Sequence, residues 1–183
     1  MATIRNATTT ATHAATTTTA VRNPGALARI IALTGLFIGV VGGIDYAIFF
    51  YLTQHETPEM VYQYIASGLL GPSAFAGGYA TALLGFLIHF AISFVVAAVF
   101  ILASSLIAFL RRPVWAVVAG LVYGAAVNMF MSTVVLPYSA APKMAVTTAL
   151  VVHGLVGDAL FVGLPVAIAA LWYARTTQAA AKA

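Results

Sequence analysis

Long runs of apolar residues divide most of the chain into four segments, separated by shorter links. The runs cover about residues 30–52, 79–110, 114–136 and 145–173. Each run is longer than the roughly 20 residues that an α-helix needs to cross about 30 Å of hydrocarbon. In lipid such a segment has to be helical, because each backbone N–H must find its acceptor within the segment. The pattern predicts an all-α integral membrane protein, an antiparallel bundle of four transmembrane helices.

The link between the first two runs is the longest, and it carries the signals of a short helix. Thr57 is a suitable N-cap, Pro58 suits the first helical position, and Glu59 would lie at the positive end of the helix dipole. Apolar residues then recur at helical spacing until Gly71 and Pro72, which would end the helix. We predict a short amphipathic helix that lies on the outer membrane surface, as a cover over the bundle or as a packed connector.

The two ends of the chain differ from the spans in composition. Residues 1–26 are rich in Thr and Ala without an apolar period, which predicts a disordered cytoplasmic tail. Residues 27–175 would form the transmembrane domain, and residues 176–183 a second cytoplasmic tail. The first tail contains arginines, and no acid occurs before Asp45, so an organelle transit peptide and an organelle membrane remain the alternative.

Composition and charge support a membrane protein. The chain is 62% hydrophobic and only 7% charged, whereas a soluble domain is typically about a quarter charged. It contains no cysteine, which excludes disulfides, thiolate metal sites and cysteine nucleophiles. The net charge of +4 comes from residues at the ends of the apolar runs. We therefore expect the lipid bilayer, and not nucleic acid, as the partner of these charges.

The basic residues also predict an orientation. Only Lys143 falls on one side of the predicted membrane, and the other seven basic residues fall on the opposite side. These seven are Arg5, Arg22, Arg29, Arg111, Arg112, Arg175 and Lys182. Because Lys and Arg accumulate in cytoplasmic segments, both termini should be cytoplasmic.

A glycine-zipper pattern marks the first span. Gly35, Gly39 and Gly43 are four residues apart, so they share one helix face and let another helix approach closely. The partner would be another helix of the same chain, or a second copy in a homo-oligomer or a larger membrane complex.

Five polar residues fall inside the spans, where they need an explanation because polar groups at membrane depth are costly. They are Asp45, His89, Asn128, His153 and Asp158. Counted from the flanking cytoplasmic charges at about 1.5 Å per residue, they form two levels. Asp45, Asn128 and Asp158 fall at about 24–26 Å, and the two histidines at about 33 Å. Since His153 and Asp158 are about 140° apart around one helix, they should serve different neighbours.

Several interpretations of this polar layer remain open. It can fix the register of the helices, with a carboxylate bonded to a histidine, to Asn128 or to a tyrosine such as Tyr46. It can line a path for an ion, proton or small solute, as in a small transporter or channel. His89 and His153 could instead ligate haem b in a redox subunit, or hold a metal together with a carboxylate. We predict no cofactor, and no enzyme motif occurs; the preferred function is a structural or accessory membrane protein.

A resemblance adds to this interpretation. Residues 64–71, Tyr-Ile-Ala-Ser-Gly-Leu-Leu-Gly, followed by a histidine-bearing second span, resemble segments of uncharacterised bacterial four-span inner-membrane proteins. The resemblance extends over most of residues 30–173. It implies a bacterial cytoplasmic membrane and brings no activity with it.

Overall fold

The computed structural model describes residues 24–180, which form helices and short links with no β-strand among them. Most of the predicted tails, residues 1–23 and 181–183, lie outside the described residues. Four stretches of helix are long and apolar enough to cross a membrane. They are Pro24–Gln54, which is α1; Gly78–Leu106, which is α3; Pro113–Tyr138; and Thr148–Thr177.

The last two stretches are each built from several elements. The third contains α4 (Pro113–Phe130), the π-helical η3 (Met131–Val135) and α5 (Leu136–Tyr138). The fourth contains α6 (Thr148–Asp158), the π-helical η4 (Ala159–Gly163) and α7 (Leu164–Ala180). The links contain α2 (Pro58–Leu70) and two short 3₁₀ turns, η1 (Gly71–Ala76) and η2 (Ala108–Arg111).

The second long helix ends earlier than the apolar pattern predicted, at Leu106 instead of near residue 110. Ile107 is extended, with φ −99° and ψ 107°, so the backbone leaves the helix there and turns through η2. The side chain of Arg111 reaches back, and its Nη2 donates to the Ser105 carbonyl at 3.0 Å. Hydropathy alone missed this stop because the residues of the turn are as apolar as the helix.

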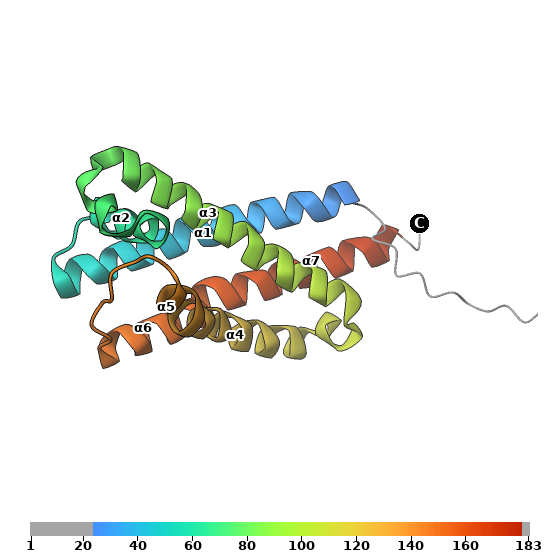
Figure 1. The fold of residues 1–183 in the computed structure, drawn as a ribbon. Coiled ribbons are helices and arrows are strands. Elements are labelled where there is room, and N and C mark those ends of the chain that lie inside the picture. Colours follow the sequence, from blue (N-terminus) through green and yellow to red (C-terminus); the bar gives the residue numbers. More distant parts are fainter. Residues whose placement is uncertain (1–23, 181–183) are drawn as a thin grey trace, which may run out of the picture.

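The four stretches lie side by side, as Figure 1 shows, and α1 and α7 have their terminal ends together. At the opposite end lie α2 and the link that leads into α6. A buried apolar core joins α1, α3 and α7 in the half nearer the terminal ends. Its residues are Leu27, Ile30, Ile38, Ala97, Phe100, Ile101, Val166, Ala167, Ala169, Ala170 and Tyr173. Large apolar side chains remain exposed along all four stretches, among them Phe37, Val95, Val122 and Trp172.

The short helix α2 begins and ends at the residues that the sequence indicates. Thr57 is its N-cap, with Oγ1 accepting a hydrogen bond from the Met60 N–H at 3.3 Å. It ends at Leu70 and is capped by Gly71, whose φ of +65° lies in the left-handed region that favours glycine.

Close backbone contact fastens α2 to α3. A Cβ at Gly85 would collide with the backbone carbonyl of Tyr62, so only glycine permits this approach. The buried Gln63 donates from Nε2 to the Gly78 carbonyl at 3.1 Å, and Tyr64 Oη donates to the Pro142 carbonyl at 3.2 Å. The helix α2 is therefore packed on α3 and tied to the link before α6.

Candidate functional site

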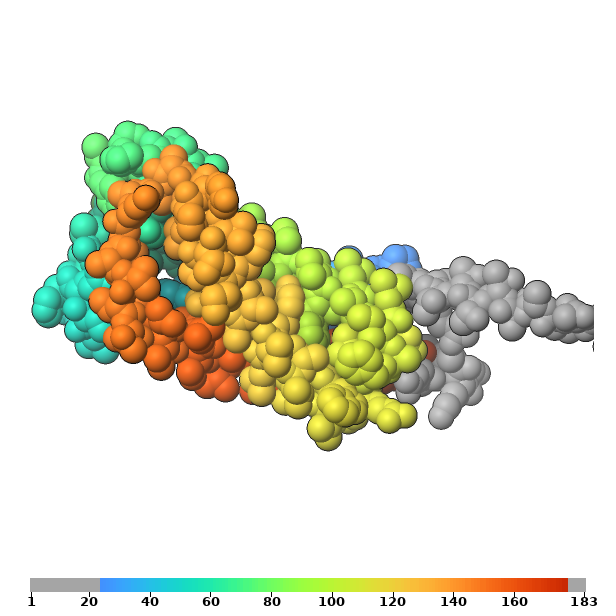
Figure 2. All heavy atoms as spheres, turned by 60° about the horizontal axis from the view of Figure 1, so that its bottom comes forward, coloured from blue at the N-terminus to red at the C-terminus, as the bar shows by residue number. Residues whose placement is uncertain are grey.

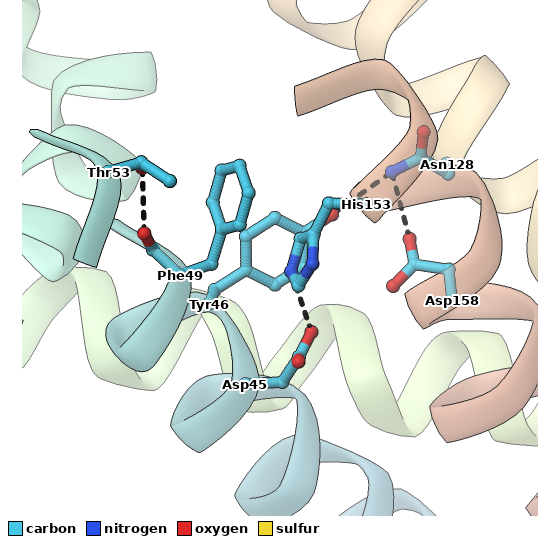
Figure 3. Close-up of polar contacts among 7 residues, drawn as sticks. All are labelled: Asp45, Tyr46, Phe49, Thr53, Asn128, His153 and Asp158. Carbon is cyan, nitrogen blue, oxygen red and sulfur yellow. Dashed lines mark hydrogen bonds and ion pairs between the residues drawn. The ribbon is translucent and has the colours of Figure 1, made fainter. Parts of the chain in front are cut away.

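Polar side chains from three helices meet in the half of the molecule away from the terminal ends, and Figure 3 shows how they lie. Asp45 and Tyr46 come from α1, Asn128 from α4, and His153 and Asp158 from α6. We call these five residues the polar cluster. Four of the five polar residues singled out in the sequence are members of it, and Tyr46 joins them.

Asn128 is the junction of the cluster. Its Nδ2 donates to Tyr46 Oη at 3.0 Å and to Asp158 Oδ2 at 3.2 Å. One amide therefore joins α4 to both α1 and α6. A hydrogen bond to a charged group contributes about 1.5–3 kcal/mol, and leaving a buried polar group unpaired costs a similar amount.

The second half of the cluster is the pair Asp45 and His153. His153 Nε2 lies 3.0 Å from Asp45 Oδ2, the distance of an ion pair, yet the two atoms are not aligned as a hydrogen bond. The His153 ring stacks on Phe49 with centroids 4.0 Å apart and planes at 13°, and it meets the edge of Tyr46 at 5.7 Å. The side chains of His153 and Asp45 remain 22% and 19% exposed. This half is less completely paired than the half around Asn128.

Glycines let the helices of the cluster approach each other. A Cβ at Gly124 on α4 would collide with the Asp158 carbonyl, and one at Gly154 on α6 would lie 2.5 Å from Asn128 Nδ2. A Cβ at Gly157 would lie 3.2 Å from Asp45 Oδ2. These three glycines therefore border the polar side chains directly.

Two π-helical segments follow the cluster residues along the chain. In η3, Leu136 N–H bonds to the Met131 carbonyl, and in η4, Leu164 N–H bonds to the Ala159 carbonyl, both in the i to i−5 pattern. Each of these leucines precedes a proline, Pro137 or Pro165. A proline ring clashes with the carbonyl four residues before it, and the wider π turn relieves that clash.

These prolines are the sequence signal for irregular helix beside the cluster, a signal that the hydrophobic pattern does not contain. Phe49 was also missed, because an aromatic residue within an apolar run has no feature that distinguishes a site from a lipid-facing position. The relevant signal is its spacing, four residues after Asp45 and hence on the same helix face.

His89 lies outside the cluster. Its Nε2 is 2.9 Å from the Gly39 carbonyl of α1, and its ring meets the edges of Tyr62 and Phe90. His89 and His153 therefore have separate partners, and each uses its Nε2 atom. Among residues 24–180, no three His, Cys, Asp or Glu side chains come together as they would to hold a metal ion.

The glycine face of α1 lies against α3 and α2. A Cβ at Gly35 would collide with the Phe94 ring, and one at Gly39 would lie 2.8 Å from the Phe90 ring. At Gly43 a Cβ would lie 2.5 Å from the hydroxyl of Tyr62 on α2. The face that the sequence singled out is thus filled by aromatic side chains of the same chain.

The two acids of the cluster lie far along the chain from any Lys or Arg. No Lys or Arg occurs between Arg29 and Arg111, between Arg112 and Lys143, or between Lys143 and Arg175. Asp158 has a neutral amide as its partner, and Asp45 has a histidine that is charged only when protonated. The arrangement can hold helices together, accept protons or attract a cation.

Comparison of the chain with known protein families, with curated proteins and with solved structures finds no match.

Proposed function

We propose that this chain is a structural or accessory protein of a bacterial inner membrane, with its four long helical stretches inserted as an antiparallel bundle and both termini in the cytoplasm. The exposed apolar side chains along all four stretches support insertion, since water would leave them unfavourably solvated. The placement of seven of the eight basic residues on one side supports the orientation.

One observation carries the structural role: Asn128 bonds simultaneously to Tyr46 on α1 and Asp158 on α6. Helices in lipid gain nothing from the hydrophobic effect when they associate, so close packing and interhelical hydrogen bonds fix their register. The glycines beside these groups supply the close packing. The hydrogen bonds of the polar cluster then hold α1, α4 and α6 together.

The topology is tested by single cysteines, which the cysteine-free chain permits. We expect a membrane-impermeant maleimide to label His55→Cys in intact cells and to label Thr177→Cys only after permeabilisation. The reverse labelling would overturn the proposed orientation, and labelling of both from one side would overturn the count of four crossings.

The accessory role is tested in the native membrane. A photo-crosslinking residue at the exposed Phe37 or Trp172 position should give a crosslinked species of defined mass, either a dimer of this chain or a complex with one other protein. Tyr138, exposed at the very end of the third stretch, is the control position. A chain that crosslinks to nothing but lipid, and is monomeric in mild detergent, would count against an assembly.

A second candidate is a small transporter, and the incomplete pairing of Asp45 and His153 favours it. An apolar core of α1, α3 and α7 occupies the other half of the molecule, so such a path would have to cross it in this conformation. Transport would thus require alternating access. Flux into proteoliposomes, with Asp45→Asn beside the wild type, tests it: flux equal to that of empty vesicles over a panel of ions and solutes would reject it.

A further inference from the structure

The contact between Asp45 and His153 is close but poorly aligned, so its strength depends on the charge of the imidazole. His153 Nε2 lies 3.0 Å from Asp45 Oδ2, yet it is buried without a hydrogen-bond partner. A neutral imidazole carries one proton, on either Nδ1 or Nε2. With the proton on Nδ1, the Nε2 lone pair would face the carboxylate and repel it. With the proton on Nε2, the misaligned N–H would gain little, because a hydrogen bond weakens steeply as it bends.

A protonated ring changes this balance. The imidazolium carries a full positive charge, and its attraction to Asp45 depends on distance more than on alignment. The charge is also favourable toward Phe49, which stacks on the ring at a centroid distance of 4.0 Å, because an aromatic face attracts a cation. Figure 3 shows the imidazole beside both partners. Arg29, the basic residue of α1, lies about 24 Å from Asp45 along the helix, too far to replace the imidazolium.

The other titratable groups around His153 are accounted for. Among the described residues, α6 packs against α1, α4 and η4. From α1, Asp45 and Tyr46 face the ring. The titratable side chain of α4, Tyr123, bonds to a carbonyl of α3, and η4 contains no titratable side chain. On α6 itself, Asp158 lies five residues further along and accepts a hydrogen bond from an amide of α4.

We propose that Asp45 and His153 form a proton-dependent joint between α1 and α6. A proton taken up by His153 holds the two helices together, and its loss leaves the Asp45 carboxylate unpaired and weakens their contact. Histidine is the side chain that changes its charge between about pH 5 and 8. Because the charged ring has these partners only in the folded chain, the joint stabilises the fold at acid pH, and the stabilisation is lost as the pH rises.

The joint goes beyond the structural role, which rests on the hydrogen bonds of Asn128. It depends on the geometry of the polar cluster and not on the proposed assembly. The side chains of His153 and Asp45 remain 22% and 19% exposed, so protons from water can reach them. In the proposed orientation, the half of the molecule that holds the cluster faces away from the cytoplasm, and the joint responds to the pH outside the cell.

Thermal unfolding of the full-length protein in mild detergent tests the joint, at about pH 5 and about pH 8. As the pH rises, the wild type should lose at least about 3 °C more in Tm than His153→Gln, because only the wild type loses the attraction of a charged ring. Asp45→Asn should remove the same difference, and the double variant should remove no more. His55→Gln, which replaces an exposed histidine just after α1, is the matched control and should respond to pH as the wild type does.

An equal pH response in the wild type and His153→Gln would overturn the proposal. So would a difference that persists when Asp45→Asn is present in both. In an Asp158→Asn background the difference should remain; its disappearance would place the proton on Asp158 and would also overturn the joint.

The protonation state of the ring is read directly by ¹⁵N NMR of labelled histidine, with the His153 signals assigned by replacing each of the other histidines in turn. We expect two protonated ring nitrogens at about pH 5 and one at about pH 8. If the variants of the cluster do not fold, as judged by gel filtration, this spectrum of the wild type decides alone, and a ring with the same charge at both pH values rejects the joint. None of these results bears on the crosslinking that tests the accessory role.

Discussion

The contact between Gly124 and the backbone of α6 and η4 gives a sharp prediction about stability. In Gly124→Ala, the new Cβ would overlap the Asp158 carbonyl and lie 2.9 Å from the Ala159 Cα. Both obstacles are backbone, so no side chain can rotate away, and α4 has to move apart from the fourth stretch. The same movement stretches the 3.2 Å bond from Asn128 Nδ2 to Asp158 Oδ2.

Three contributions set the change in the free energy of unfolding of Gly124→Ala. Overpacking costs about 1–3 kcal/mol. Weakening a hydrogen bond to a charged group adds roughly 1.5 kcal/mol. Alanine has a higher helix propensity than glycine, which offsets about 1 kcal/mol of this destabilisation. The net destabilisation is about 1.5–3.5 kcal/mol, from the sum of these three.

Gly42→Ala is the matched control, because it is the same substitution on a buried helix face without the collision. The nearest atom to its Cβ would be His89 Cε1, 4.0 Å away, which is an ordinary contact. This variant should be as stable as the wild type or up to about 1 kcal/mol more stable.

The assay is thermal unfolding in mild detergent, followed by the fluorescence of the two tryptophans, Trp115 and Trp172. At about 2–4 °C per kcal/mol for a chain of this length, Gly124→Ala should lower Tm by about 3–14 °C. If Gly124→Ala and Gly42→Ala unfold at the same temperature, the close approach of α4 to α6 and η4 is wrong.

Three further predictions use the same measurement. In a double-mutant cycle of Asn128→Ala and Asp158→Ala, the pair should show a coupling of about 0.5–3 kcal/mol, and additive losses would mean that the bond does not fasten the helices. Tyr123→Phe removes the hydrogen bond from Tyr123 Oη to the Val96 carbonyl at 2.8 Å and should cost about 0.5–1.5 kcal/mol, while Tyr138→Phe, at an exposed position, should cost nothing measurable. Thr57→Ala removes the N-cap of α2 and should cost about 0.5–2 kcal/mol, with Thr57→Ser close to the wild type; equal losses in both would contradict the capping role.

The sequence predicted the long apolar helices and the start of α2 because these features depend on local composition. A run of apolar residues longer than a bilayer needs is recognisable without any tertiary contact. Thr57, Pro58 and Gly71 act on the backbone next to them, so the limits of α2 could be read directly. The early end of α3 could not be predicted from hydropathy, because it depends on how the chain turns at Ile107.

For the site, the sequence identified which residues are costly in lipid, and counting along the helices placed them at similar depths. Depth leaves rotation about each helix axis undetermined, so it could not distinguish the partners of His89 from those of His153. The π turns before Pro137 and Pro165 change that rotation further along the two helices that carry Asn128 and Asp158.

The sequence by itself thus determined a helical chain with four long apolar stretches, a capped connecting helix and a short list of polar residues inside the stretches. Only the tertiary structure decided that His89 bonds to the Gly39 carbonyl, that His153 faces Asp45, and that Asn128 joins Tyr46 to Asp158. The physical reason is that lipid selects residues by polarity, whereas the choice of partner depends on helix rotation and on which glycines let two backbones meet.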